Sequence, residues 1–75
     1  MNLKNNIKKY RAQKNLSQRE LAERAKVTPA YIALLETGDR ENPSTNILLR
    51  LSRVLEVSVS ELLGLSEVKE VVWWI

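Results

Sequence analysis

Residues 16–38, with the sequence LSQRELAERAKVTPAYIALLETG, decide the fold of this 75-residue chain. The run 17–20, Ser-Gln-Arg-Glu, has the pattern of a capping box, in which the serine hydroxyl and the glutamate carboxylate each bond a backbone N–H at a helix start. Thr28-Pro29 supplies an N-cap followed by proline at the first helical position, and Gly38 suits the end of that helix. The stretch therefore predicts two short helices, the second over about residues 29–36.

The connection between these two helices is too short for an antiparallel hairpin. Only Lys26 and Val27 precede the cap at Thr28, and so short a joint predicts a sharp crossing. Such a crossing needs a small residue where the helices touch, which Ala22 provides, and Val27 can fill the corner. Residues 18–37 thus predict a helix-turn-helix whose second helix is free on its outer face to enter a DNA major groove.

The chain also carries helix signals on both sides of this motif. Before it, apolar residues at helical spacing predict a first helix, which Asn15 can end because asparagine tolerates left-handed backbone. After it, Ser44 caps a fourth helix, and residues 58–61 form a second capping box that opens a short fifth helix closed by Gly64. The expected inner-face residues of the first and fourth helices are Leu3, Ile7, Tyr10, Ile47, Leu48, Leu51, Val54 and Leu55. We therefore expect an all-α, compact bundle of five helices over residues 1–65.

Composition limits the chain to one domain and excludes several kinds of site. A chain of 75 residues folds around a single core. Cys 0 and His 0 exclude disulfides, the usual zinc, iron and copper ligand sets, and catalytic triads that need either residue. There is no phosphate-cradling glycine loop and no pocket-forming set of carboxylates, so we expect neither an enzyme nor a cofactor. Because there is no apolar run near 20 residues and no signal peptide, we expect a complete, cytoplasmic chain.

Charge is unevenly distributed along the chain. Residues 1–53 hold 11 Lys and Arg against 5 Asp and Glu, whereas residues 54–75 hold 1 against 4. A basic N-terminal part followed by an acidic C-terminal part is typical of a protein whose N-terminal part binds a polyanion such as DNA. A solvated, lysine-rich helix gives the same pattern without any ligand. Charge alone leaves both interpretations open.

The order and spacing of these signals resemble the Cro/CI-like family of phage and bacterial repressors, also called the XRE type. The resemblance covers about residues 3–64, and repressors of the biofilm-switch type are similar in the Asn-Pro-Ser loop and the turn 57–60. The segments that carry it are IKKYR at 7–11, LSQRELA at 16–22, YIALLETG at 31–38, NPS at 42–44 and LEVS at 55–58. The resemblance implies a lambda-repressor-like DNA-binding domain of five helices.

The resemblance also implies roles for individual residues. Gln18 matches a residue that bonds a DNA phosphate at the start of the second helix, where the helix N-terminus favours an anion. Tyr31 resembles a residue that reaches the DNA backbone, and Arg40 would add a charge beside that backbone. Arg11 and Glu36 resemble an ion pair that ties the first helix to the end of the third. The positions that face base edges are Thr28, Pro29, Ala30, Ala33 and Leu34, and those of a second phosphate clamp are Ser44, Thr45 and Asn46.

Two features depart from the family pattern. Lys26 occupies the turn position that the family usually fills with glycine, and a left-handed lysine costs about 1 kcal/mol relative to glycine. The outer face of the third helix has no Arg, Lys, Gln or Asn, the residues that read guanine and adenine by paired hydrogen bonds. Thr28, Ala30 and Leu34 would then contact thymine methyls, with further specificity from DNA shape or dimer spacing. The alternative is a helix that reads no base strongly.

Residues 66–75 form a separate apolar tail. Its apolar residues follow a helical stripe, although their β-branched side chains suit a strand equally well. Three interpretations of the tail are open: it packs on its own monomer, it pairs with a second copy, or it docks another protein or a membrane. Glu67 and Glu70 disfavour the membrane. We expect it to be a dimer or partner interface formed by Val68, Val71, Val72, Trp73, Trp74 and Ile75.

Together these features predict a non-enzymatic, sequence-specific DNA-binding regulator. As a homodimer it would place two copies of the third helix in successive major grooves of an inverted repeat, and repression is the family's usual outcome. The rival hypothesis is a protein-interaction module, antitoxin-like or partner-docking, that keeps the bundle without base-specific reading. The expected partners are double-stranded DNA, a second copy of the chain and a regulatory protein.

Overall fold

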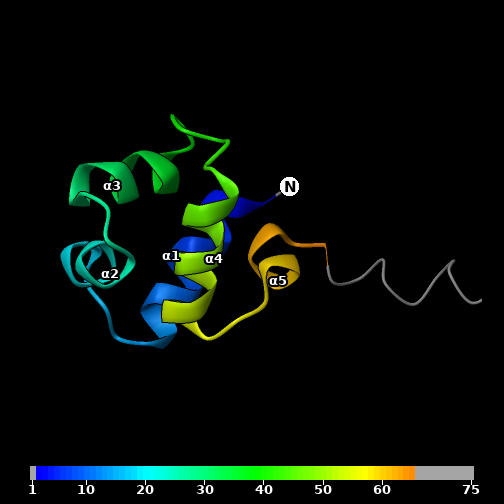
Figure 1. Ribbon diagram of the computed structural model, residues 1–75, viewed down its shortest axis with the longest axis horizontal. Helices are drawn as coiled ribbons and strands as arrows, with labels where there is room; N and C mark the ends of the chain where they lie inside the picture. The colour runs from blue at the N-terminus through cyan, green and yellow to red at the C-terminus, as the bar shows by residue number, and fades with distance from the viewer. Residues whose placement is uncertain (1, 66–75) are drawn as a thin grey trace, which may run out of the picture.

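The computed structural model describes residues 2–65, which form five helices joined by short loops (Figure 1). There is no strand within that range, and none of its helices is long and apolar enough to cross a membrane. The predicted all-α, five-helix fold is confirmed. The helices are α1 Leu3–Gln13, α2 Gln18–Ala25, α3 Pro29–Thr37, α4 Thr45–Leu55 and α5 Val59–Leu63. The apolar tail predicted for residues 66–75 lies outside the described residues, and its role stays a prediction.

The starts of four helices carry the capping contacts that the sequence predicts. Complete capping boxes open α2 and α5, where Ser17 and Ser58 accept a backbone N–H and the glutamate three residues later returns the bond. Thr28 and Ser44 cap α3 and α4, since each hydroxyl accepts the N–H of the third helical residue, at 3.1 and 3.2 Å. These contacts are local, which is why the sequence alone places the helix starts correctly.

Left-handed residues follow the ends of all five helices. The glycines that were expected to close α3 and α5, Gly38 and Gly64, have φ of 89° and 76°. Asn15 and Lys26, with φ of 58° and 61°, are left-handed as predicted. Glu56, with φ of 60°, ends α4 and was not predicted. Lys26 and Glu56 each cost about 1 kcal/mol in this conformation, whereas asparagine adopts it more readily.

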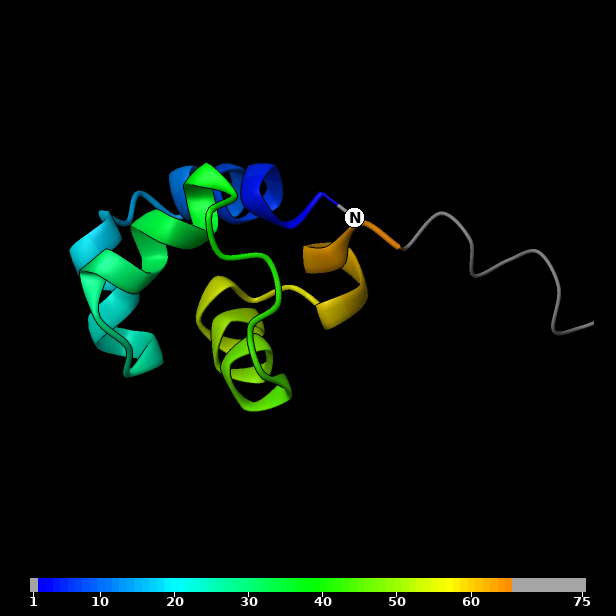
Figure 2. The same cartoon turned by 90° about the horizontal axis from the view of Figure 1, so that it is seen from above.

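The core lies where the inner faces of all five helices meet (Figure 2). Ala22 and Ala25 on α2 are fully buried, and such small side chains let α2 pack closely on α3 and α4. On the predicted inner stripe of α4, Leu51 and Leu55 are buried, whereas its other members only border the core. The largest fully buried side chains are Ile7, Leu21, Ile32, Leu35, Leu51, Leu55 and Leu62.

A buried amide joins the first helix to the last. Asn6 is 8% exposed, and its Nδ2 donates to the backbone oxygens of Leu62 at 3.0 Å and Glu61 at 3.3 Å. Carbonyls in the last turn of a helix have no partner within the helix, and Asn6 supplies one to the Leu62 oxygen, whereas the Glu61 oxygen also accepts the Gly64 N–H at 3.1 Å. A Cβ on Gly64 would lie 3.3 Å from Asn6 Nδ2 and 3.7 Å from Asn2 Cβ, so residues 2 and 64 lie side by side. This contact was not predicted from the sequence.

Candidate nucleic-acid interface

α2 and α3 cross at the end of the molecule opposite α5 (Figure 1, Figure 2). In the turn between them, Lys26 is left-handed and the Val27 N–H donates to the Ala22 oxygen at 3.0 Å. Val27 is half-buried against the core, which fits its predicted place at the corner. Arg50 of α4 adds a contact that sequence reasoning missed, because its Nη1 lies 3.4 Å from the backbone oxygens of Ala25 and Lys26. The turn is thus held from both α2 and α4.

α3 exposes the surface that was predicted to meet base edges. Leu34 is 39% exposed, and Ala33 is half-buried. The Thr28 hydroxyl oxygen already accepts the Tyr31 N–H, so its methyl group remains for an apolar contact. The exposed members of the predicted set are Thr28, Pro29, Ala30 and Leu34. This surface suits methyl groups rather than the polar edges of guanine or adenine.

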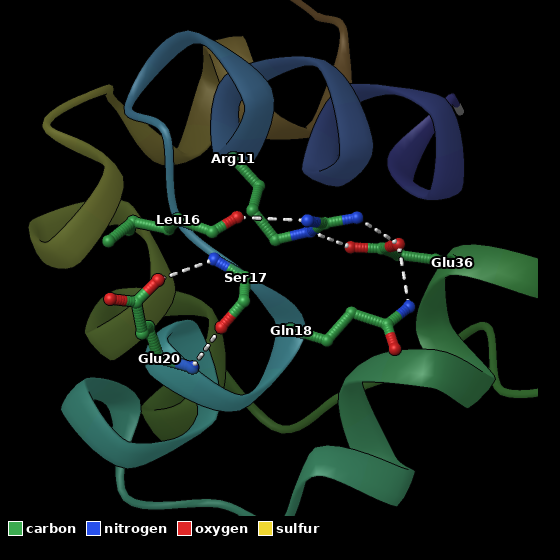
Figure 3. A network of polar contacts seen from close by, with 6 residues as sticks. All are labelled: Arg11, Leu16, Ser17, Gln18, Glu20 and Glu36. Carbon is green, nitrogen blue, oxygen red and sulfur yellow. Dashed lines mark hydrogen bonds and ion pairs between the residues drawn. The ribbon is translucent and has the colours of Figure 1, made fainter.

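An ion pair joins α1 to the end of α3 (Figure 3). Arg11 Nε donates to Glu36 Oε2 at 2.6 Å, and Nη2 donates to Oε1 at 2.9 Å. The third guanidinium nitrogen, Nη1, donates to the Leu16 oxygen at 2.9 Å, just before α2. The side chains of Glu36 and Arg11 are 4% and 19% exposed. Two parallel bonds to a carboxylate fix orientation as well as distance, so the pair sets the direction of α3 relative to α1.

Burial and charge act in opposite directions on this pair. Burial by itself raises the pKa of Glu36, but hydrogen bonds from Arg11 and Gln18, with the positive charges of Arg11 and Lys8, outweigh it. The pKa of Glu36 therefore lies below its ordinary value. The hydrogen bond to Glu36 raises the pKa of Arg11 further above neutrality. Both groups consequently stay ionised at neutral pH.

Gln18 belongs to the same network (Figure 3). From the first position of α2, its Nε2 donates to Glu36 Oε1 at 3.0 Å. A side-chain amide has two N–H bonds, so the second remains for another acceptor. The family resemblance implied a phosphate contact for Gln18 but not its contact with Glu36. That contact ties the start of α2 to the end of α3.

A second helix start lies beyond the loop that follows α3. Ser44, Thr45 and Asn46 are all exposed at the N-terminus of α4. The Ser44 hydroxyl accepts the Ile47 N–H. The N–H groups at the first positions of α4 have no partner within the helix. Exposed N–H groups of this kind favour an anion.

Arg40, in that loop, lies against α3. Its Cζ is 5.3 Å from the centroid of the Tyr31 ring, and its backbone N–H donates to the Leu34 oxygen at 3.1 Å. The sequence predicted neither contact. Across residues 2–65, no three Asp, Glu, His or Cys side chains gather to hold a metal ion.

A capped, two-residue turn, a buried crossing and an exposed second helix define a helix-turn-helix domain. The helix-turn-helix family model matches residues 7–62, and the chain belongs to that family, as the resemblance to XRE-type regulators predicted. The transcriptional regulator SinR of Bacillus subtilis is 46% identical over 57 residues, which cover 76% of this chain and 51% of SinR. An uncharacterized HTH-type regulator of Archaeoglobus fulgidus is 33% identical over 60 residues, covering 80% of this chain and 83% of that protein.

Solved structures give the same assignment. The N-terminal DNA-binding domain of SinR from Bacillus subtilis superposes with a TM-score of 0.79 at 42% identity, covering 83% of this chain and 90% of that chain. SinR in complex with DNA superposes with a TM-score of 0.78 at 43% identity, covering 81% of this chain and 97% of that chain. This chain spans about half the length of the curated SinR proteins that it matches. These relatives are transcriptional regulators, a non-enzymatic class.

Proposed function

We propose that this chain is a sequence-specific, DNA-binding regulator of transcription. The observation that carries the proposal is the exposed outer face of α3, whose direction is fixed by the buried Arg11–Glu36 pair. A helix of this size fits a major groove, and the starts of α2 and α4 present N–H groups suited to backbone phosphates. SinR, which has been solved in complex with DNA, supports this function by its similarity.

The proposed contacts follow from the chemistry of each surface. Ala30, Leu34 and the Thr28 methyl would pack on thymine methyls, with Pro29 and Ala33 at the edges of that surface. The second N–H of Gln18 would bond one phosphate while the first keeps its bond to Glu36. The other residues proposed to lie at the DNA backbone are Tyr31, Arg40, Ser44, Thr45 and Asn46.

The proposed operator is an inverted repeat bound by a homodimer, with residues 1–65 as the DNA-binding domain. Two copies of α3 would enter successive major grooves about 10 base pairs apart, and the bound protein would repress by blocking polymerase. Residues 66–75 stay the predicted dimer or partner interface. We place the protein in the cytoplasm, because its named relatives are regulators from bacteria and an archaeon.

The rival function is a protein-interaction module. The apolar outer face of α3 and the exposed Leu34 and Leu49 favour it. A regulatory protein partner is also compatible with DNA binding, since SinR has been solved as a complex with the protein SinI. Salt dependence separates the two functions, because a DNA complex loses affinity with a log-log slope of about −0.9 for each phosphate neutralised by a cation.

The test is selection of bound duplexes from a random DNA pool, followed by titration at two salt concentrations. We expect an enriched inverted repeat with half-sites about one helical turn apart, and binding that weakens steeply with salt. Steep salt dependence without a consensus would reduce the proposal to non-specific DNA binding. Absence of DNA binding would contradict it and favour the interaction module.

Leu34 and Leu49 provide a matched pair of variants for the same assay. They are 39% and 38% exposed, on α3 and α4, and a glutamate at either position changes the net charge equally. Leu34→Glu should weaken binding about tenfold or more, since it places a carboxylate where α3 meets DNA. Leu49→Glu should change affinity by about twofold or less. Equal effects of the two variants would contradict the proposed role of α3.

A further inference from the structure

The loop after α3 supplies a cation that α3 itself lacks. α3 contains no Arg, Lys, Gln or Asn, whereas Arg40 lies over the ring of its Tyr31. We propose that Tyr31 is a positioning residue whose ring holds the Arg40 guanidinium ready to bind a DNA phosphate beside α3. This inference rests on the proposed function and names one of its contacts.

Arg40 is held at two points. Its backbone N–H donates to the Leu34 oxygen at 3.1 Å, which fixes the start of the loop to the last turn of α3. Its guanidinium carbon lies 5.3 Å from the centroid of the Tyr31 ring. Tyr31 is half-buried and packs against the hydrophobic core, so the ring is an anchored platform rather than a free surface side chain.

The charge of Arg40 is available to a ligand. The ion pairs that the structure describes over residues 2–65 are Arg11–Glu36 and Lys14–Glu56, and neither involves Arg40. The neighbouring Asp39 is bonded elsewhere, since its Oδ2 accepts the Thr37 hydroxyl at 3.0 Å. Arg40 is exposed, so its N–H donors face solvent.

The contact with the Tyr31 ring prepares this guanidinium for a phosphate. A planar guanidinium can keep one face on an aromatic ring while its edge donates two parallel hydrogen bonds to phosphate oxygens. An arginine already ordered by a ring loses less conformational freedom on binding than a free one. Lysine carries the same charge but has neither the plane nor the fork, so it reproduces only the electrostatic part.

Two roles for Tyr31 are distinguishable. In the positioning role the ring matters and the hydroxyl does not, whereas in the role expected from the family resemblance the hydroxyl contacts the DNA backbone directly. Tyr31→Phe removes only the hydroxyl, and Tyr31→Leu removes the ring while keeping an apolar side chain against the core.

The experiment measures affinity and salt slope by fluorescence anisotropy on a labelled duplex of about three helical turns. The duplex carries the selected inverted repeat, or mixed sequence if the selection yields none. The variants are Arg40→Ala, Arg40→Lys, Tyr31→Phe, Tyr31→Leu and the Tyr31→Leu/Arg40→Ala double variant. Arg53→Ala is the control, since it removes an exposed arginine from the last turn of α4. Thermal melting of each variant checks that it is folded.

We expect Arg40→Ala to weaken binding about five- to tenfold and to reduce the salt slope by about 0.9 for each bound protomer. Arg53→Ala should leave the slope unchanged. Arg40→Lys and Tyr31→Leu should each keep the salt slope, because each keeps a cation at position 40. Each should lose about two- to fivefold in affinity. Tyr31→Leu should have no further effect once Arg40 is alanine, and Tyr31→Phe should lose less than Tyr31→Leu.

Three results would overturn the inference. One is an equal salt slope for Arg40→Ala and Arg53→Ala, because it would show that Arg40 binds no phosphate. Another is an affinity loss in the double variant equal to the sum of the two single losses in free energy, because it would show that Tyr31 and Arg40 act independently. The third is an equal loss for Tyr31→Phe and Tyr31→Leu, which assigns Tyr31 a direct hydroxyl contact. Absence of any DNA binding by the parent protein would instead overturn the proposed function and this contact with it.

Discussion

Replacement of Glu36 by alanine tests the link between the buried ion pair and the function of α3. The substitution removes the acceptor for two Arg11 bonds, at 2.6 and 2.9 Å, and for the Gln18 bond at 3.0 Å. Arg11 would keep only its bond to the Leu16 oxygen. We expect a lower free energy of unfolding and weaker DNA binding together, because the pair fixes α3 relative to α1 and Gln18 relative to α3.

The magnitude follows from the burial of the two partners. Breaking a fully buried ion pair costs about 3–5 kcal/mol, because the remaining charge is left without compensation. Glu36 is 4% exposed, but the Arg11 side chain is 19% exposed and recovers part of its hydration. We therefore expect a loss of about 2–4 kcal/mol, a large share of the roughly 4–11 kcal/mol typical of a chain this long. For a domain of this size the loss lowers Tm by about 10–30 °C.

The assay is thermal and denaturant unfolding followed by far-ultraviolet circular dichroism, with DNA affinity measured at a temperature where the variant is folded. Glu56→Ala is the matched control, since Glu56 pairs with Lys14 across an exposed surface and is 71% exposed. The control should shift Tm by less than about 3 °C. Equal Tm losses for the two variants, or an unchanged DNA affinity for folded Glu36→Ala, would refute the reasoning.

Three further predictions concern stability. Asn6→Leu should cost about 1–3 kcal/mol in unfolding free energy, because it removes the side-chain donor that the buried Leu62 carbonyl accepts at 3.0 Å; an unchanged denaturation midpoint would contradict this. Lys26→Gly should raise Tm by about 4–8 °C in calorimetry, since glycine removes a left-handed strain of about 1 kcal/mol, and a lower Tm would show that the lysine contributes more than its strain costs. The folded-state pKa of Glu36 is below the ordinary value of 4.5, so its pair stabilises the fold above that pH and the contribution is lost as pH falls through the folded-state pKa. The Tm difference between the parent and Glu36→Gln should therefore shrink on acidification below pH 4.5, and a constant difference would exclude this linkage.

Local chemistry made the helix boundaries predictable from the sequence. A cap involves residues three apart, so Ser17, Thr28, Ser44 and Ser58 could be assigned without knowledge of the tertiary structure. The left-handed lysine in the turn was predictable from the family resemblance, because Lys26 occupies the position that the family usually fills with glycine. Glu56 was missed, since a glutamate at a helix end carries no local signal for left-handed backbone.

Contacts between distant residues were not predictable in the same way. Asn6 bonds residues 55 and 56 positions away, and nothing in its neighbourhood distinguishes it from the exposed Asn5. The bond from Gln18 to Glu36 and those from Arg50 to the turn depend on how helices pack, which the apolar pattern fixes only coarsely. The predicted DNA-facing residues are on the surface, but which of them act together emerged only from the structure.

The adjacency of residues 2 and 64 has a practical consequence for protein engineering. Both lie beside α5, at the opposite end of the molecule from α2 and α3 (Figure 1). A reporter fused before residue 2 or after residue 65 would leave the domain from the same corner, with the helix-turn-helix pointing away from the attachment. A short linker across that corner would also allow circular permutation, with new chain ends opened in the exposed loop 39–42. We therefore expect residues 2–65 to tolerate insertion into another protein through a single attachment point.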